Sequence, residues 1–317
     1  MQDIFLSDLA YALGDDAVTV HESAKAGRLV SDPDALLNAG FRTHHLCRPQ
    51  TTVVDLAARS LDRFQAPLCA APILIFATAL TPNGNLGDPV TCEETGDVRH
   101  LMDFPASRLQ VQLGLADTAV IGLNQQACTA TLGAIRVARG LLAAEPDLGQ
   151  VICVSADRFP EGATYEQSYN VISDGSAAFR ISKCEGPFRV LACHQLTNGT
   201  LAAASDDETV GAYFSHTQRL IGETVARAGL GIADVDWLVP QNMNRAAWLV
   251  MARLLQLPEE RVACATLGDV GHVIAADNII NLHSLAASGQ LKQGERVLMV
   301  MAGFGMNWQA VLLEVTS

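Results

Sequence analysis

Residues 118–142 read TAVIGLNQQACTATLGAIRVARGLL and contain a complete change from strand to helix. The apolar run 119–123 predicts a buried strand, a polar turn follows it, and Cys128 precedes an amphipathic helix over 129–144. Unpaired backbone N–H groups and the macrodipole at a helix N-terminus favour a thiolate, which is the form that attacks a carbonyl carbon. The segment therefore predicts a nucleophilic Cys128 at the tip of a sheet, with a buried packing cysteine as the alternative.

Strand and helix patterns alternate along the whole chain, which indicates an α/β fold. We expect short buried strands at 73–77, 119–123, 151–155, 237–239 and 297–301, and helices at 53–63, 129–144, 217–228, 245–255 and 278–288. Comparable strand pairs, at 151–181 and 297–315, end the two halves of the chain. The pattern predicts two related halves, residues 1–185 and 186–317.

The composition is that of a globular enzyme. The chain has 317 residues, of which 49% are hydrophobic and 17% charged, so it can bury a large core. Its formal net charge of -13 and the absence of any Lys/Arg run argue against a nucleic-acid or anionic-membrane surface, because such partners require concentrated positive charge.

The compartment is predicted from the N-terminus and the cysteines. Asp3 and Asp8 interrupt the apolar residues of 1–13, which do not have the pattern of a signal peptide. The longest apolar stretch, 67–82, contains Pro72 and is too short to cross a bilayer. Eight cysteines with no C-x-x-C pair fit a reducing compartment better than a disulfide framework or a zinc site. We expect a cytoplasmic protein with no metal, no cofactor, and neither nucleic acid nor membrane as partner.

Five segments accompany the Cys128 elbow and make the pattern specific. They are AGFRTHHL at 39–46, ISDGSAAF at 172–179, DWLVPQNMN at 236–244, TLGDVGHVIAAD at 266–277 and AGFGMNW at 302–308. In this order and at these separations they resemble β-ketoacyl-ACP synthase III of the thiolase superfamily. In that family a T-G-I-R segment precedes the reactive Cys, and D-G, W-L-V-P-H-Q-x-N, H-G-N and glycine-rich segments follow it. The resemblance covers most of the chain.

The resemblance implies an αβαβα five-layer sandwich of two similar halves, a homodimer, and Cys128 as the acylated nucleophile. It also implies an oxyanion hole formed by the backbone N–H groups of Cys128 and Phe304. Gly303 and Gly305 flank Phe304, and glycines suit a turn whose backbone approaches the substrate closely. The alternative for these glycines is only a tight turn.

Two positions depart from the family pattern. Gln241 stands where the synthases have a His in V-P-H, and His272 stands where they have the Asn of H-G-N. Those two groups stabilise the enolate formed when a malonyl thioester loses carbon dioxide. Gln241 can donate a hydrogen bond but does not titrate in the useful range, so His272 is the titratable group of this site.

Asp277 could orient His272 in a Cys-His-Asp arrangement, or it could cap the helix that begins at Asn278. The G-H-x-x-x-x-D pattern resembles the acyltransferase-like branch of synthase III-like proteins in secondary metabolism. Asn244 matches the Asn that follows V-P-H-Q-x and is a further polar candidate for substrate binding, with Gln241.

The donor is predicted from positions outside the nucleophile site. Asp34 and Asn38 stand where family members often stack the CoA adenine between a Trp and an Arg, which favours an acyl carrier protein over CoA as the thioester partner. Arg245 and Arg253 are candidate docking charges for a carrier; a solvated helix face is the alternative.

Three functions follow from these residues. The leading one is a ping-pong acyltransferase, in which Cys128 takes an acyl group from a thioester and His272 deprotonates a hydroxyl, amine or thiol acceptor. The second is decarboxylative condensation, with Gln241 and His272 holding the enolate. The third is a noncatalytic partner subunit, against which the intact Cys128 elbow argues.

Overall fold

The computed structural model describes residues 3–64, 68, 72–168, 170–204 and 206–316. Within them, nine strands form one mixed sheet. These strands are β1 (Phe5–Leu13), β4 (Ile73–Ala77), β5 (Ala119–Leu123), β6 (Gln150–Asp157), β9 (Gly175–Ser182), β10 (Phe188–Thr197), β11 (Trp237–Val239), β12 (Arg296–Gly303) and β13 (Asn307–Val315). Two small sheets pair β2 (Asp16–Thr19) with β3 (Thr43–Leu46) and β7 (Glu166–Gln167) with β8 (Asn170–Val171).

Helices connect these strands. The α-helices are α1 (Val20–Lys25), α2 (Pro33–Asn38), α3 (Val53–Leu61), α4 (Pro89–Thr95), α5 (Pro105–Gln112), α6 (Ala130–Ala144), α7 (Asp206–Arg227), α8 (Arg245–Leu255), α9 (Leu267–Val270) and α10 (Asp277–Ala287). The 3-10 helices are η1 (Thr81–Gly84), η2 (Val98–Leu101), η3 (Ala127–Thr129), η4 (Gly199–Ala203), η5 (Ile232–Asp234), η6 (Glu259–Arg261) and η7 (Ile274–Ala276).

Two sets of strands meet in the large sheet at β1 and β10, which pair antiparallel with Phe5 opposite Arg189. The strand order is β11-β12-β13-β10-β1-β9-β6-β4-β5. On one side of the junction, β9 pairs antiparallel with β6, and β6 pairs parallel with β4. On the other side, β13 pairs antiparallel with β12, and β12 pairs parallel with β11. The two sets thus share one order and one pattern of directions. The boundary between residues 185 and 186 stays a prediction.

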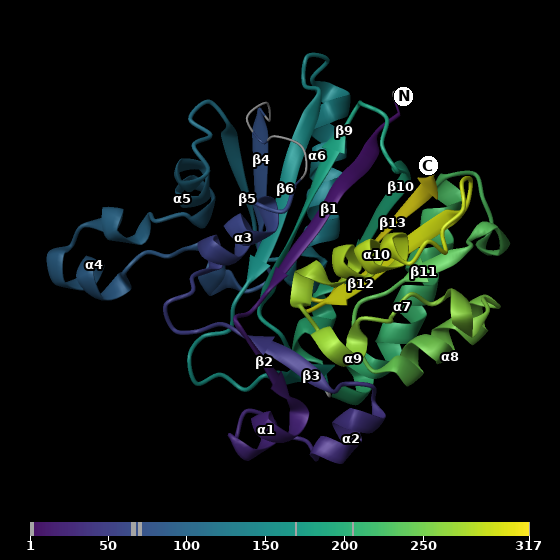
Figure 1. Cartoon of the computed structure of the whole chain (residues 1–317), viewed down its shortest axis with the longest axis horizontal. Helices are drawn as coiled ribbons and strands as arrows, with labels where there is room; N and C mark the ends of the chain where they lie inside the picture. Colours follow the sequence, from purple (N-terminus) through teal and green to yellow (C-terminus); the bar gives the residue numbers. More distant parts are fainter. Residues whose placement is uncertain (1–2, 65–67, 69–71, 169, 205, 317) are drawn as a thin grey trace.

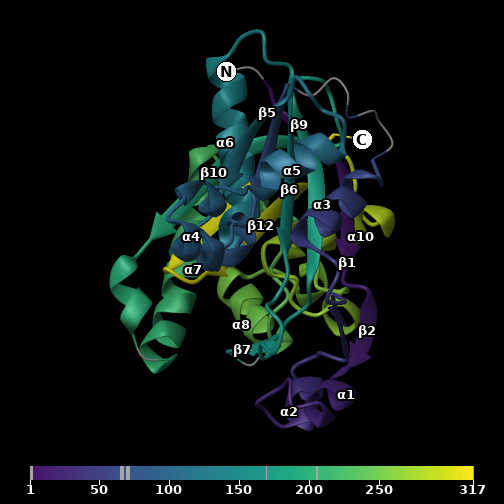
Figure 2. The same ribbon diagram turned by 90° about the vertical axis from the view of Figure 1, so that its left-hand side faces the viewer.

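Helices cover both outer faces of the sheet and fill the space between its two sets of strands (Figures 1 and 2). On one outer face α3 packs against β1, β6 and β9, and α5 packs against β4 and β5. In the middle, α6 contacts β6 and β13, while α10 contacts β1 and β12. On the other outer face α7 packs against β10 and β13 and beside α8. These layers confirm the predicted αβαβα sandwich.

The central helix α6 is buried on most of its surface. Ala130, Ala134 and Ala138 let its backbone lie close to both sets of strands, and Leu132 and Ile135 fill the remaining space. A helix that is apolar around most of its circumference is normally a core helix or a membrane span. The window 127–144 reaches the length and hydropathy of a span, but more than half of it is buried inside this fold, as in a core helix.

The predicted strands and helices all occur, with ends within two residues except at the start of α7. The sequence prediction began that helix at residue 217, whereas it begins at Asp206. Gly211 and a weak apolar period conceal the start of this helix, and tertiary contacts such as the edge-to-face pair of Tyr213 and Trp248 override the local signal. Of the apolar stretch 67–82, residues 67 and 69–71 lie outside the described part.

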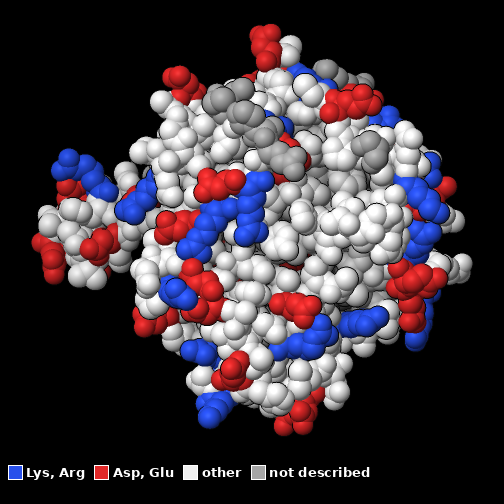
Figure 3. Space-filling model, in the orientation of Figure 1, with Lys and Arg blue, Asp and Glu red and all other residues white. Residues whose placement is uncertain are grey.

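An arm and the surface charge complete the outline. Helices α4 and η2, within residues 89–101, form an arm that projects from the body beyond α5 (Figure 1). Figure 3 shows Lys and Arg in small groups next to Asp and Glu, so this face carries no continuous basic surface.

Candidate active site

Cys128 lies at a sharp bend between β5 and α6. The residue belongs to η3, directly before α6, and its side chain is buried. Gln125 and Ala127 have φ angles of 64° and 45°, which non-glycine residues rarely adopt. Such backbone strain persists only where the surroundings hold it, and it concentrates at functional sites. The bend places the thiol at the N-terminal end of α6, as the sequence predicts.

The thiol faces a buried histidine and a buried aspartate. Sγ of Cys128 lies 3.6 Å from Nε2 of His272, and Nδ1 of His272 lies 2.5 Å from Oδ2 of Asp277. His272 is 4% exposed and Asp277 is 0% exposed, so bulk water does not separate the three groups. The fold therefore brings thiol, imidazole and carboxylate into one row.

Asp277 accepts two further hydrogen bonds. Its Oδ2 accepts from the backbone N–H of Asn242 at 2.6 Å, and its Oδ1 accepts from the N–H of Val273 at 2.7 Å. All of these donors lie outside α10, the helix that Asp277 could have capped. Three hydrogen bonds stabilise the charge of a buried carboxylate, and the geometry corresponds to the orienting alternative.

The protonation of His272 follows from its neighbours. Burial by itself lowers the pKa of His272, because the imidazolium loses its contact with water. The charge and hydrogen bond of Asp277, together with the contact to Cys128, outweigh burial and raise the pKa of His272 to about 10. Nε2 of His272 therefore carries a proton toward Cys128 near neutral pH.

The glycine-rich turn between β12 and β13 lies against Cys128. A Cβ atom at Gly303 would come within 2.8 Å of the backbone N of Cys128, so the close approach requires glycine. Gly305 has a φ of 121°, a conformation that also favours glycine. Within the described part of the chain, neither the N–H of Cys128 nor that of Phe304 meets a backbone acceptor. Both donors are therefore available to another group.

Gln241 holds this turn through its side-chain oxygen. Oε1 of Gln241 accepts from the backbone N–H of Ala302 at 2.6 Å, one residue before Gly303. Because Ala302 supplies a donor, the oxygen of the amide must face it, and Nε2 of Gln241 faces elsewhere. Gln241 lies 7% exposed between β11 and α8, and Trp248 donates from Nε1 to its carbonyl at 2.9 Å.

Other predicted site residues lie on the surface or at helix ends. Asn244 caps α8, because its side chain accepts from the N–H of Ala246 at 3.0 Å. Arg245 follows it on the exposed side of α8. Arg253 is exposed on the same helix and forms an ion pair of 2.7 Å with Glu259.

Asp34 and Asn38 are exposed on α2, and this helix lies near the start of α8. The backbone N–H of Arg245 donates at 3.2 Å to the carbonyl of Ala39, the residue that ends α2. Neither Asp34 nor Asn38 supplies the aromatic or cationic surface on which an adenine stacks.

Asn242 and Tyr213 are site residues that the sequence analysis missed. Asn242 donates from Nδ2 to the carbonyl of Gly271 at 2.9 Å and so joins the segment of Gln241 to that of His272. Asn242 lies within the motif at 236–244, but the family pattern pointed to Asn244 instead. Tyr213 donates from its hydroxyl to Sδ of Met243 at 3.0 Å. Burial, with a smaller contribution from the charge of Cys128, raises the pKa of Tyr213, which belongs to no motif.

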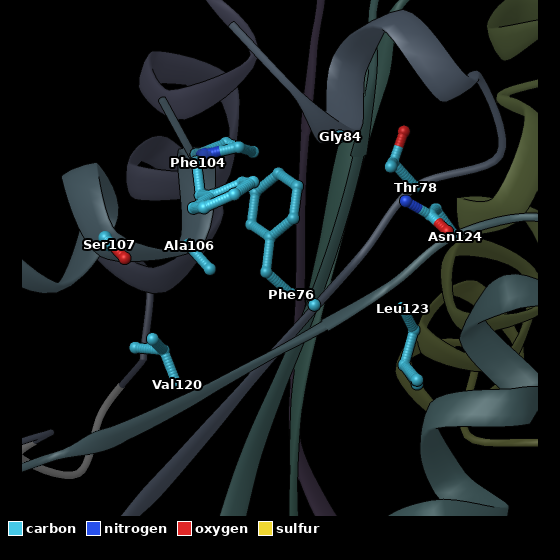
Figure 4. A pocket seen from close by; sticks show the side chains of 11 residues that line it. Phe76, Thr78, Gly84, Phe104, Ala106, Ser107, Val120, Leu123 and Asn124 are labelled. Atoms are coloured by element: carbon cyan, nitrogen blue, oxygen red, sulfur yellow. The ribbon is translucent and has the colours of Figure 1, made fainter. Parts of the chain in front are cut away.

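A separate cavity of about 330 Å³ lies beside β4, β5 and α5 (Figure 4). Phe76, Phe104 and Val120 form its apolar walls, and Thr78 and Asn124 contribute polar groups. None of the predicted site residues lines this cavity. Asn124 is its connection to the site, because the bend toward Cys128 begins directly after that residue.

The layers define a thiolase-fold protein, and the row Cys128, His272, Asp277 is its candidate active site. Residues 225–315 match the family model described as 3-oxoacyl-[acyl-carrier-protein (ACP)] synthase III C terminal. The chain is similar to β-ketoacyl-ACP synthase III of the thiolase superfamily, and its relatives support a transferase that passes on or condenses acyl groups.

Relatives and solved structures agree with this assignment. The β-ketoacyl-[acyl-carrier-protein] synthase III of Allorhizobium ampelinum is 28% identical over 241 residues, which cover 67% of this chain and 73% of the relative. That of Brucella canis is 26% identical over 324 residues, covering 90% and 91%. Two solved structures superpose on nearly the whole chain. ChlB3, titled an acyltransferase, has a TM-score of 0.82 at 19% identity and covers 99% of this chain and 98% of its own. The synthase III of Pseudomonas aeruginosa has a TM-score of 0.81 at 21% identity and covers 100% and 99%.

Proposed function

We propose that this protein is an acyltransferase that forms a thioester on Cys128 and passes the acyl group to a hydroxyl, amine or thiol acceptor. The row of Cys128, His272 and Asp277, at 3.6 Å and 2.5 Å, carries the proposal. A thiol in contact with an imidazole, which a third group orients, is the arrangement of nucleophilic acyl transfer.

The first half-reaction starts from a thiolate beside a protonated His272. The Cys128 sulfur attacks the carbonyl carbon of the donor thioester, and the tetrahedral intermediate expels the donor sulfur. The proton on Nε2 of His272 moves to that leaving sulfur, which departs as a thiol. His272 is then neutral beside the acylated Cys128, and the raised pKa of His272 loses the part that came from Cys128.

The second half-reaction returns the proton to the same nitrogen. Neutral His272 takes the proton of the acceptor as the acceptor attacks the Cys128 thioester, and collapse of the intermediate expels the Cys128 thiolate. Asp277 holds the ring orientation and stabilises the imidazolium throughout. The cycle closes with the original pair, so the site needs no further acid or base.

The oxyanion of both intermediates requires donors that are already in place. The backbone N–H groups of Cys128 and Phe304 fit this role because neither meets a backbone acceptor in the described part of the chain and Gly303 lies against Cys128. Gln241 supports the pair, since its Oε1 holds Ala302 at the start of the turn.

Condensation is the second candidate, because the curated relatives are named as β-ketoacyl synthases. Decarboxylation of a malonyl thioester needs two strong donors aimed at the enolate oxygen. Gln241 can offer only its amide Nε2, since its oxygen is engaged with Ala302, and an amide is a weaker donor than an imidazolium. Transfer needs only His272 beside the acyl group, which favours acyl transfer to a heteroatom.

A carrier protein is the proposed thioester partner. The surface of α8 offers Arg245 and Arg253 together with Val250 and Leu254, which are 44% and 50% exposed. Such a mixed basic and apolar face suits an acidic carrier, although the Glu259 partner of Arg253 weakens its charge. The residues of α2 that would meet CoA, Asp34 and Asn38, offer no stacking surface.

A homodimer is proposed from the edge of the large sheet. Strand β5 lies at that edge, carries no charge, and is half-buried or exposed along its length. Phe104 is 48% exposed and lines the cavity beside β5, and Val98 and Met102, which precede it in the chain, are exposed apolar residues as well. An uncharged edge strand beside apolar surface is a site for association. The cytoplasmic location stays a prediction.

Intact-protein mass spectrometry tests the proposed function. The parent chain is incubated with a panel of acyl-carrier and acyl-CoA thioesters, beside Cys128→Ala and Cys264→Ala. We expect the mass of one acyl group on the parent and on Cys264→Ala, a partly buried cysteine of a different segment, and none on Cys128→Ala. Equal labelling of parent and Cys128→Ala would exclude this nucleophile.

A further inference from the structure

A buried amide on β13 contacts the residues on both sides of the nucleophile. Gln309, 1% exposed, donates from Nε2 to Oε1 of Gln126 at 2.9 Å and to Oγ1 of Thr129 at 3.1 Å. The hydroxyl of Thr129 donates in turn to the backbone carbonyl of Gln126 at 2.7 Å. One side chain near the C-terminus therefore connects the position two residues before Cys128 to the position after it.

Gly133 makes the space for this contact. A Cβ atom at Gly133 would lie 1.9 Å from Oε1 of Gln126 and 3.3 Å from Nε2 of Gln309. Glycine in a helix interior is unfavourable relative to alanine, and where it occurs it usually has a packing or functional reason. For Gly133, the fourth residue of α6, that reason is the amide of Gln126.

The same contact fixes the strained part of the backbone. Gln126 lies between Gln125 and Ala127, which both have positive φ angles. Such angles are unfavourable for non-glycine residues, so a relaxed backbone would have the lower local free energy. We propose that Gln309 is a positioning residue that holds this bend, so that Sγ of Cys128 stays beside His272 and the N–H of Cys128 stays in the oxyanion hole. The inference rests on the proposed function, because its consequence is the rate of Cys128 acylation.

The expected effect is on rate rather than on substrate affinity. Gln309 is buried and belongs to the support of the bend, so its loss leaves the substrate surface unchanged. Without its two N–H donors, Gln126 and Thr129 lose their shared partner and the bend can relax. A misplacement of about 1 Å at a reacting group can cost about a hundredfold in rate.

The experiment compares Gln309→Leu, Gly133→Ala and the double variant with the parent. Gly133→Ala displaces the same amide by a different route, and only the end of a flexible side chain has to move. Gly140→Ala is its matched control, because it lies in α6 with nothing within 4 Å of the new Cβ. Ser176→Ala is the control for Gln309→Leu, since it removes a buried hydrogen bond to Leu56.

Four quantities are measured: the saturating rate and the half-saturation of single-turnover acylation, the rate of Cys128 alkylation by iodoacetamide, and the melting temperature. We expect both single variants to lose about tenfold to a hundredfold in the acylation rate at unchanged half-saturation, and to alkylate more slowly. The double variant should be no slower than the slower single variant, because both act on one contact. Gly133→Ala should keep the parent melting temperature. The controls Gly140→Ala and Ser176→Ala should keep the parent rates.

Parent-like acylation and alkylation in Gln309→Leu, or additive losses in the double variant, would overturn the inference. If Gln309→Leu does not fold, parent-like rates in Gly133→Ala overturn it by themselves. Alkylation also separates this inference from the proposed function, because iodoacetamide reports the thiol without an acyl substrate. If the parent accepts no acyl group, but both variants are alkylated more slowly than the parent, the positioning role is supported and the acyltransferase function is rejected.

Discussion

Nε2 of His272 lies 3.6 Å from Sγ of Cys128, although 144 residues separate them in the sequence. The contact exists because η3 packs against η7, the turn that follows His272, where the two sets of strands share their middle layer. An imidazole at this distance can both give a proton to a departing thiolate and take one from an arriving acceptor.

Substitution His272→Ala should lower acyl transfer to the acceptor by about 10² to 10⁴, the usual effect of losing a general base. Asp277→Asn should lower it less, because the amide can still contact the ring while the charge is lost. Stopped-flow measurement of acceptor acylation decides between these outcomes. His194→Ala is the control and should keep the parent rate, because His194 lies on β10 and pairs with Glu223. A parent-like His272→Ala would remove this residue from the chemistry.

Substitution Gln241→His should raise carbon dioxide release from a malonyl thioester, because a second imidazole donor would then face the enolate. Gln241→Ala should cost about 1 to 3 kcal/mol in the free energy of unfolding, since the buried N–H of Ala302 loses its acceptor. Its transfer rate should fall less than that of His272→Ala. Labelled malonyl thioester and urea titration supply the two measurements. Rapid malonyl decarboxylation coupled to a β-ketoacyl product in the parent would instead favour the condensing function.

The stability of the folded chain should fall with rising pH between about 6.5 and 10. The pKa of His272 rises from 6.5 to about 10 on folding, so in this window the native state holds a proton that the unfolded state has lost. The stabilising contribution of the His272 proton is complete below pH 6.5 and is lost once the pH passes the pKa of His272 in the folded state. Urea unfolding at several pH values checks this. Asp277→Asn lacks the charge that raises the pKa of His272 and should give a flatter curve. Parallel curves for the two proteins would contradict the assignment.

Substitution Gly303→Ala should destabilise the fold by about 1 to 3 kcal/mol, because its Cβ meets the backbone N of Cys128 at 2.8 Å and backbone cannot move aside easily. Displacing that N–H would also disturb the proposed oxyanion hole, so Cys128 acylation should fall by about 10² to 10³. Thermal unfolding and the mass-shift assay measure both effects. Gly140→Ala should leave both properties at or above the parent values. An acylation rate unchanged in Gly303→Ala would show that the turn has no part in the reaction.

Much of the fold and part of the site could be predicted from local sequence. The strand at 119–123, the bend at Cys128 and the helix after it follow from composition and periodicity over a few residues, and β4, β11 and α8 have the predicted limits. The order of the motif segments pointed to the thiolase-like layers. The predicted start of α7 was wrong because the local helix signal before residue 217 is weak, while the helix makes tertiary contacts such as that of Tyr213 with Trp248.

From the sequence by itself, periodicity and turn chemistry predicted an α/β fold and the place of Cys128 at a helix start, because these signals act over short distances along the chain. The resemblance carried by the ordered motifs implied the αβαβα architecture and pointed to His272 as the titratable group. Tertiary structure alone decided the rest. It turned Asp277 toward His272 instead of a helix cap, made Asn244 a cap while Asn242 joined the site, and engaged the oxygen of Gln241 with Ala302. It also brought Gln309 to the bend at Gln126. Each of these side chains had more than one partner available locally, and only the packing of distant segments in a buried middle layer, where every polar group needs a partner, selected one.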